Sequence, residues 1–347
     1  NKLLNKFSLP KFSLGKLLGK VSQDWTAINL GSSCLKGIIV EQGKAVDYFV
    51  EENIGLAAAI EKLSLAEKIP AKKVKICLKS PNCLVRYFSF PKMERQKMSQ
   101  ALFYELNKFI PFPPEEVCFD FFVLGEANPK EFLILLAAAK KDFINETLEV
   151  FEKNSLEVLQ ISLDSICIVN LFLNNYQPVS ANAIESAAQA NACLLDIGYK
   201  SSTMTLVHKG APFITRDLNF SAEDVFKVAA RIKNLTLVQI KEQVLSGKQT
   251  NEFLESAGDS FFNLRQEMKN SFEYFEVNKG ERVDKLYLSG GFASVKGVES
   301  SFTGFPDLKV EVLKIFPEPI KNVGEVFLNK TFEPLKNSFS AVFGIVL

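Results

Sequence analysis

The sequence has very little histidine and no clustered cysteine. Its 347 residues include one histidine, His208, and no CxxC pair. One histidine and scattered cysteines fit neither a zinc site nor a disulfide framework. The single histidine also argues against histidine-based catalysis. We expect His208 to be a solvated residue in a turn. The cysteines lie mostly inside apolar stretches and are predicted to be buried, reduced thiols of a cytoplasmic protein: Cys34, Cys77, Cys83, Cys118, Cys167 and Cys193.

Long apolar runs and an excess of one charge are also missing. Phe132–Ala139 is among the longest apolar runs, and it falls short of the roughly 20 residues that a membrane span needs. Lys and Arg number 41 against 40 Asp and Glu, so the net charge of +1 provides no general field that would attract nucleic acid. With 47% hydrophobic residues, the chain is expected to be globular and to divide into two domains.

The first 23 residues differ from the rest. They carry lysines but no acidic residue before Asp24, and Pro10 divides their leucines into two short amphipathic pieces. These pieces are too broken for a signal peptide. Two interpretations stay open, namely a weak anchor on a membrane surface and a disordered basic tail.

The rest of the chain is organised around one stretch, Cys193–Val207. An apolar strand ends near Asp196, a turn follows at Gly198 with the hydroxyls of Ser201 and Ser202, and a second strand completes a hairpin. Glycine lets the backbone approach an anion, hydroxyls donate to phosphate oxygens, and a carboxylate can hold a hydrated magnesium ion. The stretch is therefore a candidate phosphate-binding hairpin, with Asp196 as the candidate contact to Mg²⁺ through water.

A second copy of this pattern, Trp25–Val40, lies about half a chain earlier, as in a duplicated domain. It has a strand, a polar residue, a glycine turn with hydroxyls, and a second strand. Two related domains are therefore expected to face each other across a cleft, where the two hairpins would contact one polyphosphate. The candidate residues of this copy are Asn29, Gly31, Ser32, Ser33 and Lys36.

Two further segments complete the predicted organisation. Ser289-Gly290-Gly291 follows an expected strand and is predicted to begin a helix, an arrangement that lets a nucleotide lie against the backbone beside a helix N-terminus. Glu252–Val277, which precedes that strand, is predicted as one long helix. Between the two hairpins, Cys83–Asn154 reads as strand, helix, strand, strand and helix, which predicts a small α+β unit inserted into the first domain.

The three glycine turns and the duplication resemble the actin-like ATPase superfamily, and the inserted unit is similar to that of the PilM family of type IV pilus assembly. The matching segments are Val85-Arg86, Phe90-Pro91-Lys92-Met93, Glu105, Ile110-Pro111-Phe112, Glu115-Glu116, Asp120 and the apolar end Ser340–Leu347. The resemblance implies an α/β, actin-like (ribonuclease H-like) two-domain fold with an inserted subdomain of the FtsA/PilM type. In this scheme, residues 1–24 form a tail, 25–83 and 161–190 the first domain, 84–160 the insertion, and 191–347 the second domain, whose last segment packs back on the first.

The resemblance also implies a function. PilM-like proteins are cytoplasmic and peripheral at the inner membrane, bind ATP with Mg²⁺, and hold the N-terminal tail of the membrane protein PilN, which connects them to the pilus alignment complex. The nucleotide-binding residues would be those of the two hairpins together with Ser289, Gly290, Gly291 and Lys241, which stands where the family has a lysine facing the ribose. No catalytic residue is implied.

The sequence departs from the family in three places. Asn29 stands where the family has Asp, and an amide lacks the charge that would bind magnesium or activate water, which argues against hydrolysis. Val238 occupies the acidic position that precedes Lys241, and no glycine pair follows Arg216. The alternatives left open are an FtsA-like cell-division protein, a GspL-like secretion component and a small-molecule kinase of the same superfamily.

Overall fold

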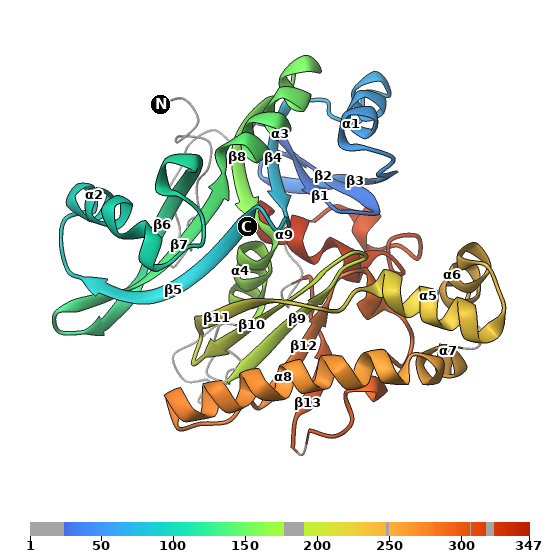
Figure 1. The fold of residues 1–347 in the computed structure, drawn as a ribbon. Coiled ribbons are helices and arrows are strands. Elements are labelled where there is room, and N and C mark those ends of the chain that lie inside the picture. Colours follow the sequence, from blue (N-terminus) through green and yellow to red (C-terminus); the bar gives the residue numbers. More distant parts are fainter. Residues whose placement is uncertain (1–23, 177–190, 248–249, 306, 317–322) are drawn as a thin grey trace. The chain divides into compact units, whose positions relative to one another are not determined.

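The computed structural model describes residues 24–176, 191–247, 250–305, 307–316 and 323–347 (Figure 1). The N-terminal tail and the stretch 177–190 lie outside these residues, so the two interpretations of the tail stay predictions. Within the described residues, no helix is both long and apolar enough to cross a bilayer. The chain divides into two compact units. The first comprises residues up to Asn170 with Asn322–Gly324 and Val342–Leu347, and the second comprises Leu171–Lys321 and Glu325–Ala341.

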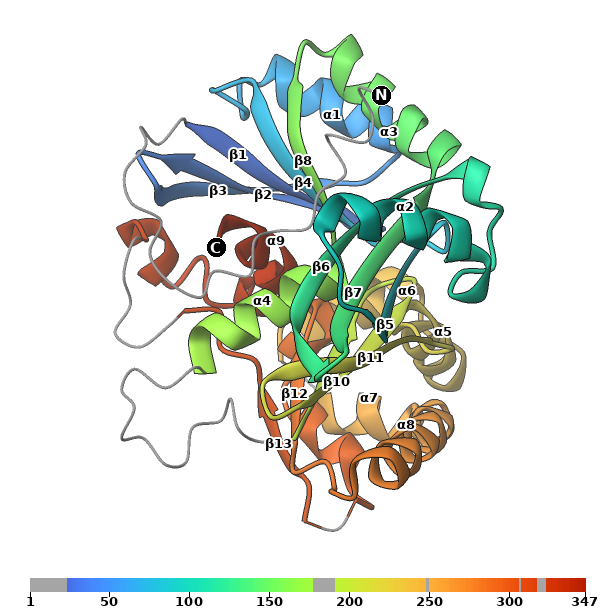
Figure 2. The same cartoon turned by 90° about the vertical axis from the view of Figure 1, so that its left-hand side faces the viewer.

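The first unit contains a five-stranded sheet of order β3-β2-β1-β4-β8 (Figure 2). Its first three strands form an antiparallel meander, and β4 and β8 run parallel to β1. The helices α1 and α3 lie side by side over this sheet in both views. The elements are β1 (Trp25–Leu30), β2 (Cys34–Glu41), β3 (Lys44–Glu52), α1 (Leu56–Leu65), β4 (Lys73–Leu78), α3 (Lys141–Lys153) and β8 (Glu157–Leu163).

The inserted unit has its own three-stranded sheet, of order β5-β7-β6. Alternate residues of its strands enter two different cores, as the period of two in a strand requires. One face packs with α3 and the first sheet through Val85 and Ala137, and the other packs with α2 through Leu102 and Ile134. The elements are β5 (Cys83–Pro91), α2 (Arg95–Glu105), η1 (Leu106–Lys108), η2 (Pro114–Glu116), β6 (Val117–Asn128) and β7 (Glu131–Lys140).

The second unit repeats the topology of the first, with a sheet of order β11-β10-β9-β12-β13. Again the first three strands are antiparallel and the last two are parallel to the first, so the predicted duplication is confirmed. The long helix α8 lies along this sheet, and α5, α6 and α7 gather near one of its ends (Figure 1). The strands are β9 (Ala192–Ile197), β10 (Ser202–His208), β11 (Ala211–Leu218), β12 (Lys285–Ser289) and β13 (Lys309–Val312).

The helices of the second unit surround one apolar core, in which Phe253, Phe261 and Phe292 are nearly inaccessible. Two helices, α4 and α9, have residues in both units. The helices are α4 (Asp164–Tyr176), α5 (Ala222–Lys233), α6 (Leu237–Leu245), α7 (Thr250–Ser256), α8 (Gly258–Lys279) and α9 (Ser340–Val346), with short 3-10 turns at η4 (Gly291–Ser294), η5 (Val298–Phe302), η6 (Glu325–Leu328) and η7 (Lys336–Phe339).

The prediction of one helix over Glu252–Val277 is wrong. The chain forms α7 and α8 with a break at Ala257, whose φ of −96° and ψ of 11° leave the helical range. Phe253, before the break, and Phe261, after it, both enter the same core. A bend at the small residues Ala257 and Gly258 lets both segments bury their apolar faces, and tertiary packing thereby overrides a continuous helical pattern.

The prediction that a helix begins at the third glycine turn is also wrong. Only the 3-10 turn η4 follows Gly290, and the chain leaves it at Val295, whose ψ of 117° is extended. Gly297, with a φ of +84°, then turns the chain away. A single 3-10 turn has no accumulated helix dipole, so anion binding at a helix N-terminus does not apply here.

Candidate functional site

In the first unit, the hairpin of β1 and β2 presents a tight polar turn. Ser32 and Ser33 are exposed at its tip. A methyl group added at Gly31 would lie 2.5 Å from the backbone oxygen of Cys34, so this close turn requires glycine. Asn53 supports the turn, since its Nδ2 donates to the Gly31 oxygen at 2.8 Å. The hydroxyls and backbone at the tip are therefore accessible, while the turn itself is fixed.

Asn29 lies beneath this turn and is 4% exposed. Its Nδ2 donates to the Oδ1 atom of Asp164 at 2.9 Å, so the amide is not directed freely to solvent. Its Oδ1 lies 3.4 Å from the position that a Cβ atom at Gly31 would take, and the Nζ of Lys36 lies at the same distance from that position. Asn29 and Lys36 thus lie next to the turn, as opposite residues in the register of β1 and β2.

In the second unit, Asp196, Ser289 and Gly290 come together at the ends of two parallel strands. Ser289 is the register partner of Asp196, and its hydroxyl donates to the Oδ1 atom of Asp196 at 3.2 Å. Gly290 has a φ of +86°, and a Cβ atom there would lie 2.7 Å from the same carboxylate oxygen and 2.5 Å from the backbone oxygen of Ile197. Only glycine allows this close approach, which leaves the carboxylate of Asp196 bordered by backbone.

The turn of the second hairpin is tied to the helices α5 and α6. Lys241 donates from its Nζ to the hydroxyl of Tyr199 at 2.9 Å and lies 4.3 Å from the centre of that ring. The backbone N–H of Glu223 donates to the oxygen of Tyr199 at 2.9 Å. The pKa of the Glu223 carboxyl lies below its ordinary value, first because Lys227 donates to it, with smaller contributions from Tyr199 and Lys200. Lys241 is therefore held at the hairpin turn by Tyr199.

The remaining predicted residues of the second unit differ in accessibility. Ser201 is exposed, and its backbone oxygen accepts from the N–H of Gly198 at 3.1 Å, which closes the turn. Gly291 is exposed beside Gly290. Ser202, in contrast, is fully buried in β10. The hydroxyl of Ser202 is thus covered by the protein, whereas Ser201 lies at the surface.

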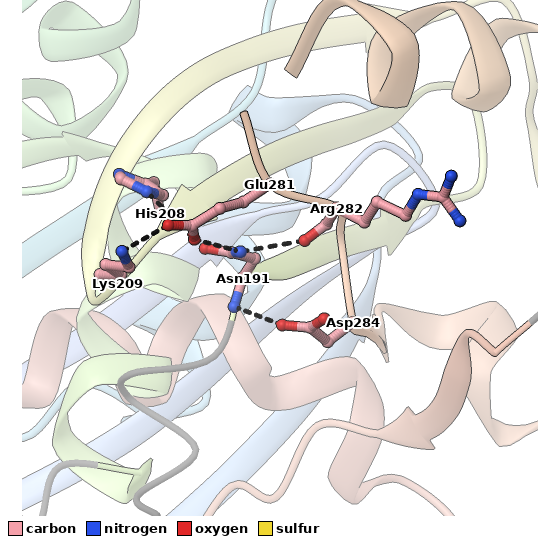
Figure 3. A network of polar contacts seen from close by, with 6 residues as sticks. All are labelled: Asn191, His208, Lys209, Glu281, Arg282 and Asp284. Atoms are coloured by element: carbon pink, nitrogen blue, oxygen red, sulfur yellow. Dashed lines mark hydrogen bonds and ion pairs between the residues drawn. The ribbon is translucent and has the colours of Figure 1, made fainter. Parts of the chain in front are cut away.

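The expectation that His208 is a solvated turn residue is wrong. It is the last residue of β10, its side chain is 25% exposed, and its Nε2 lies 3.5 Å from Glu281 (Figure 3). Burial, followed by the nearby Lys279, holds the pKa of the imidazole below its ordinary value. Lys209 and Asn191 donate to Glu281 and lower its pKa to about 2. The histidine therefore belongs to a polar network that joins the β10–β11 turn to the residues before β9 and β12.

The six cysteines are free thiols, and all except Cys34 are buried, which agrees with the expectation. Burial raises the pKa of the Cys118 thiol to about 11, so this thiol is protonated at neutral pH.

Two parts of this geometry were not assigned from the sequence. Tyr199 was visible within the glycine turn but received no role, and only the fold brings it to Lys241. Asp164 directly follows an apolar strand, and a carboxylate at a strand end is a pattern that could have identified it as a candidate site residue. Its contact with Asn29, 135 residues away in sequence, depends on the sheet.

The residues present fit a phosphate ligand in their chemistry. The first hairpin offers a turn that excludes a side chain at Gly31, the exposed Ser32 and Ser33, and the nearby Lys36. The second hairpin offers the exposed Ser201 and has Lys241 at its turn. Hydroxyl and ammonium groups donate to phosphate oxygens, and a carboxylate such as Asp196 suits the waters around a magnesium ion.

Comparison with solved structures shows the fold of the chain. The chain is similar to a structure of the PilM-PilN type IV pilus biogenesis complex, with 21% identity, a TM-score of 0.76, and coverage of 94% of this chain and 98% of the other. It is also similar to the ethanolamine utilization protein EutJ from Carboxydothermus hydrogenoformans, with 11% identity, a TM-score of 0.54, and coverage of 98% and 95%. The two matching sheets and these similarities show the actin-like ATPase fold.

The family follows from the sequence itself. The pattern of the family "Type IV pilus assembly protein PilM" matches residues 23–326, and the chain belongs to this family. It is thus a type IV pilus assembly protein, and the cell-division, secretion and small-molecule kinase alternatives are not favoured.

Proposed function

We propose that the chain is a cytoplasmic, nucleotide-binding scaffold of the type IV pilus machine that holds the N-terminal tail of a PilN-like inner-membrane protein. Membership of the PilM family and the similarity to the PilM-PilN complex support this proposal. By holding that tail, the chain would be peripheral at the inner membrane and connected to the pilus alignment complex. Residues 1–23 are proposed as a second contact with the membrane surface.

The observation that carries the peptide-binding proposal is a gradient of burial along one face of the inserted sheet. In β5, Cys83 and Val85 are buried on this face, Tyr87 is partly exposed and Ser89 is exposed. In β7, Leu135 is buried and is followed on the same face by the partly exposed Leu133. The first sheet and its helices cover the buried end through their shared core. The other end leaves an apolar surface in reach of a ligand.

Aromatic side chains from both outer strands border this surface. Tyr87 in β5 and Phe122 in β6 are both register partners of Leu135, and both are partly exposed. Leu124 continues the row on β6. We call the surface formed by Tyr87, Phe122, Leu124 and Leu133 the apolar sheet face. An extended peptide can place alternate side chains on such a face while its backbone pairs with a neighbouring strand edge.

The ligand proposed for the glycine turns is ATP with Mg²⁺. In the second unit, Asp196 would hold the magnesium ion through water, while Gly198 and Ser201 would bind phosphate. Ser202, which the sequence suggested as a further phosphate contact, is buried and is left out of the proposed site. Ser289, Gly290 and Gly291 would border the adenosine, and Lys241 the ribose. The hairpin of the first unit is proposed to bind phosphate through Gly31, Ser32, Ser33 and Lys36, with Asn29 as a neutral acceptor. Because an amide activates water poorly, we expect binding without efficient hydrolysis.

Peptide binding is tested by fluorescence anisotropy with labelled N-terminal peptides of the PilN-like protein from the same pilus system. Replacing Tyr87 with alanine is expected to weaken binding at least tenfold, or about 1.4 kcal/mol, because the change removes an aromatic anchor from the apolar sheet face. The wild-type chain is expected to bind with saturation.

Tyr104→Ala provides a matched control, since Tyr104 lies on α2 and is 83% exposed. The change removes the same side-chain atoms as Tyr87→Ala, but at a position outside the apolar sheet face. The affinity of this variant for the peptide should therefore equal that of the wild type. Equal affinities for Tyr87→Ala and Tyr104→Ala would place the peptide elsewhere, and a wild type that does not bind the peptide would contradict the proposed function.

A further inference from the structure

A buried polar group lies where three strands of the first sheet end. The strands β1, β4 and β8 run parallel, and Leu30, Leu78 and Leu163 are aligned near their carboxyl ends. Asp164 directly follows β8 and begins α4, while Asn29 is the last residue but one of β1. Parallel strands bring their carboxyl ends to one edge of a sheet, which places these two side chains together although β4 lies between their strands.

The chemistry of this pair fixes the orientation of the Asn29 amide. A carboxylate only accepts hydrogen bonds, so the group of Asn29 that faces Asp164 at 2.9 Å must be the Nδ2 donor. The same nitrogen lies 3.5 Å from the backbone oxygen of Cys77, a second acceptor. Both contacts hold Nδ2 on the side of the amide that faces Asp164 and Cys77. The amide oxygen is consequently turned to the opposite side, next to Gly31.

Burial makes this orientation costly to reverse. Asn29 is 4% and Asp164 8% exposed, so water does not replace a lost partner easily. Turning the amide over would direct its oxygen at the oxygen of Asp164. Burial, followed by contact with Cys167 and the charge of Asp164, raises the pKa of the Cys77 thiol well above its ordinary value, so Cys77 stays neutral in this group. Asp164 is then the acceptor that decides how Asn29 points.

We propose that Asp164 is a positioning residue for nucleotide binding, which holds Asn29 so that its amide oxygen, and not its NH2 group, faces the Gly31 turn. The inference rests on the proposed nucleotide-binding function. Near this turn, Lys36 can donate to a phosphate oxygen, and the amide oxygen of Asn29 can accept from a water on the accompanying magnesium ion. A reversed amide would offer a second donor in place of that acceptor.

The test compares ATP affinity, measured by titration calorimetry in the presence of Mg²⁺, across a set of folded variants. Asp164→Ala removes the acceptor and is expected to weaken ATP binding at least tenfold. Asp164→Asn retains a carbonyl oxygen that can accept from Asn29, and its affinity should stay within threefold of the wild type. Ser162→Ala is the control, because Ser162 is a buried polar residue of the adjoining strand β8.

A swap of the two side chains covers the case in which Asp164→Ala does not fold. Asn29→Asp alone puts two buried carboxylates in contact and should lower both stability and ATP affinity. Asn29→Asp combined with Asp164→Asn restores one donor and one acceptor, and should recover both. Failure of the double variant to recover ATP affinity, in a protein with restored stability, would overturn the inference.

A second readout does not use nucleotide. In asparagine-labelled protein, the side-chain amide signal of Asn29 should be protected from hydrogen exchange in the wild type and lose that protection in Asp164→Ala. A wild type that binds no ATP contradicts the proposed function and this inference with it. A wild type that binds ATP, together with an Asp164→Ala variant of equal affinity, contradicts only the inference.

Discussion

Replacement of Gly290 with alanine is expected to weaken the binding of nucleotide and to destabilise the second unit. The new Cβ would lie 2.5 Å from the backbone oxygen of Ile197 and 2.7 Å from the Oδ1 of Asp196. In addition, the φ of +86° is unfavourable for alanine. Strain and overpacking together should cost about 2–4 kcal/mol in the free energy of unfolding. Since relief of the overlap displaces Asp196, ATP affinity should fall at least tenfold.

The neighbouring glycine supplies a matched control for this variant. A Cβ at Gly291 would meet only the Cβ of Ser338, at an ordinary contact distance of 3.9 Å. Gly291→Ala should therefore keep the stability of the wild type in thermal denaturation. If Gly290→Ala unfolds at the same temperature as Gly291→Ala and binds ATP as well as the wild type, the close contact of the third glycine turn with Asp196 is not required.

Gly344→Ala is expected to have the largest effect on stability in the first unit. Gly344 lies in α9, and a Cβ there would lie 1.8 Å from the backbone oxygen and 2.4 Å from the backbone carbon of Cys167 in α4. Backbone atoms cannot turn aside as a flexible side chain can, so the two helices must separate. We expect a loss of at least about 3 kcal/mol, the upper part of the range for overpacking. Differential scanning calorimetry should show a melting temperature lower by roughly 5 °C or more.

Gly258→Ala serves as the control for this loss. Gly258 begins α8, and nothing lies within 4 Å of a Cβ atom at this position. Alanine in a helix is favoured over glycine, so stability should stay equal or rise by up to about 1 kcal/mol. A Gly344→Ala variant as stable as Gly258→Ala would contradict the close backbone contact between α9 and α4.

The sequence was sufficient to predict the two hairpins of the candidate site and the inserted unit. Strand, polar residue, glycine turn and strand occur twice, and this local pattern predicted both hairpins because turn chemistry and strand periodicity act over short distances. The insertion of β5, α2, β6 and β7 followed from the same rules, with a proline-containing segment after η1 marking where the helical segment stops. The repeated sheet order then confirmed the duplication.

The parts that were missed depend on contacts between distant segments. Asp164 lies next to Asn29 because β4 pairs both with β1, which contains Asn29, and with β8, which directly precedes Asp164. A local sequence pattern does not show which strands pair or in which register. The break between α7 and α8 lies in a segment with a helical pattern, and the core around Phe253 and Phe261 decides it. Tyr199 likewise reaches Lys241 only after α6 has packed near the hairpin turn.

Because the chain belongs to the PilM family, the geometry of the glycine turns can be related to its proposed role as a nucleotide-binding scaffold. The two glycine-turn groups are built with donors and close backbone contacts, but the amide of Asn29 is held by Asp164 instead of supplying a charge. This arrangement suits a ligand that is bound and retained more than one that is hydrolysed. A bound nucleotide could then change the affinity for a partner by favouring one conformation over another.

Nucleotide binding without efficient hydrolysis is tested most directly by calorimetric titration of the wild type and of Asp196→Ala with ATP and Mg²⁺, combined with an assay of released phosphate. We expect saturable binding of one ATP by the wild type, loss of that binding in Asp196→Ala, and little phosphate release by either. Absence of binding by the wild type, or unchanged binding by Asp196→Ala, would contradict the proposed nucleotide site.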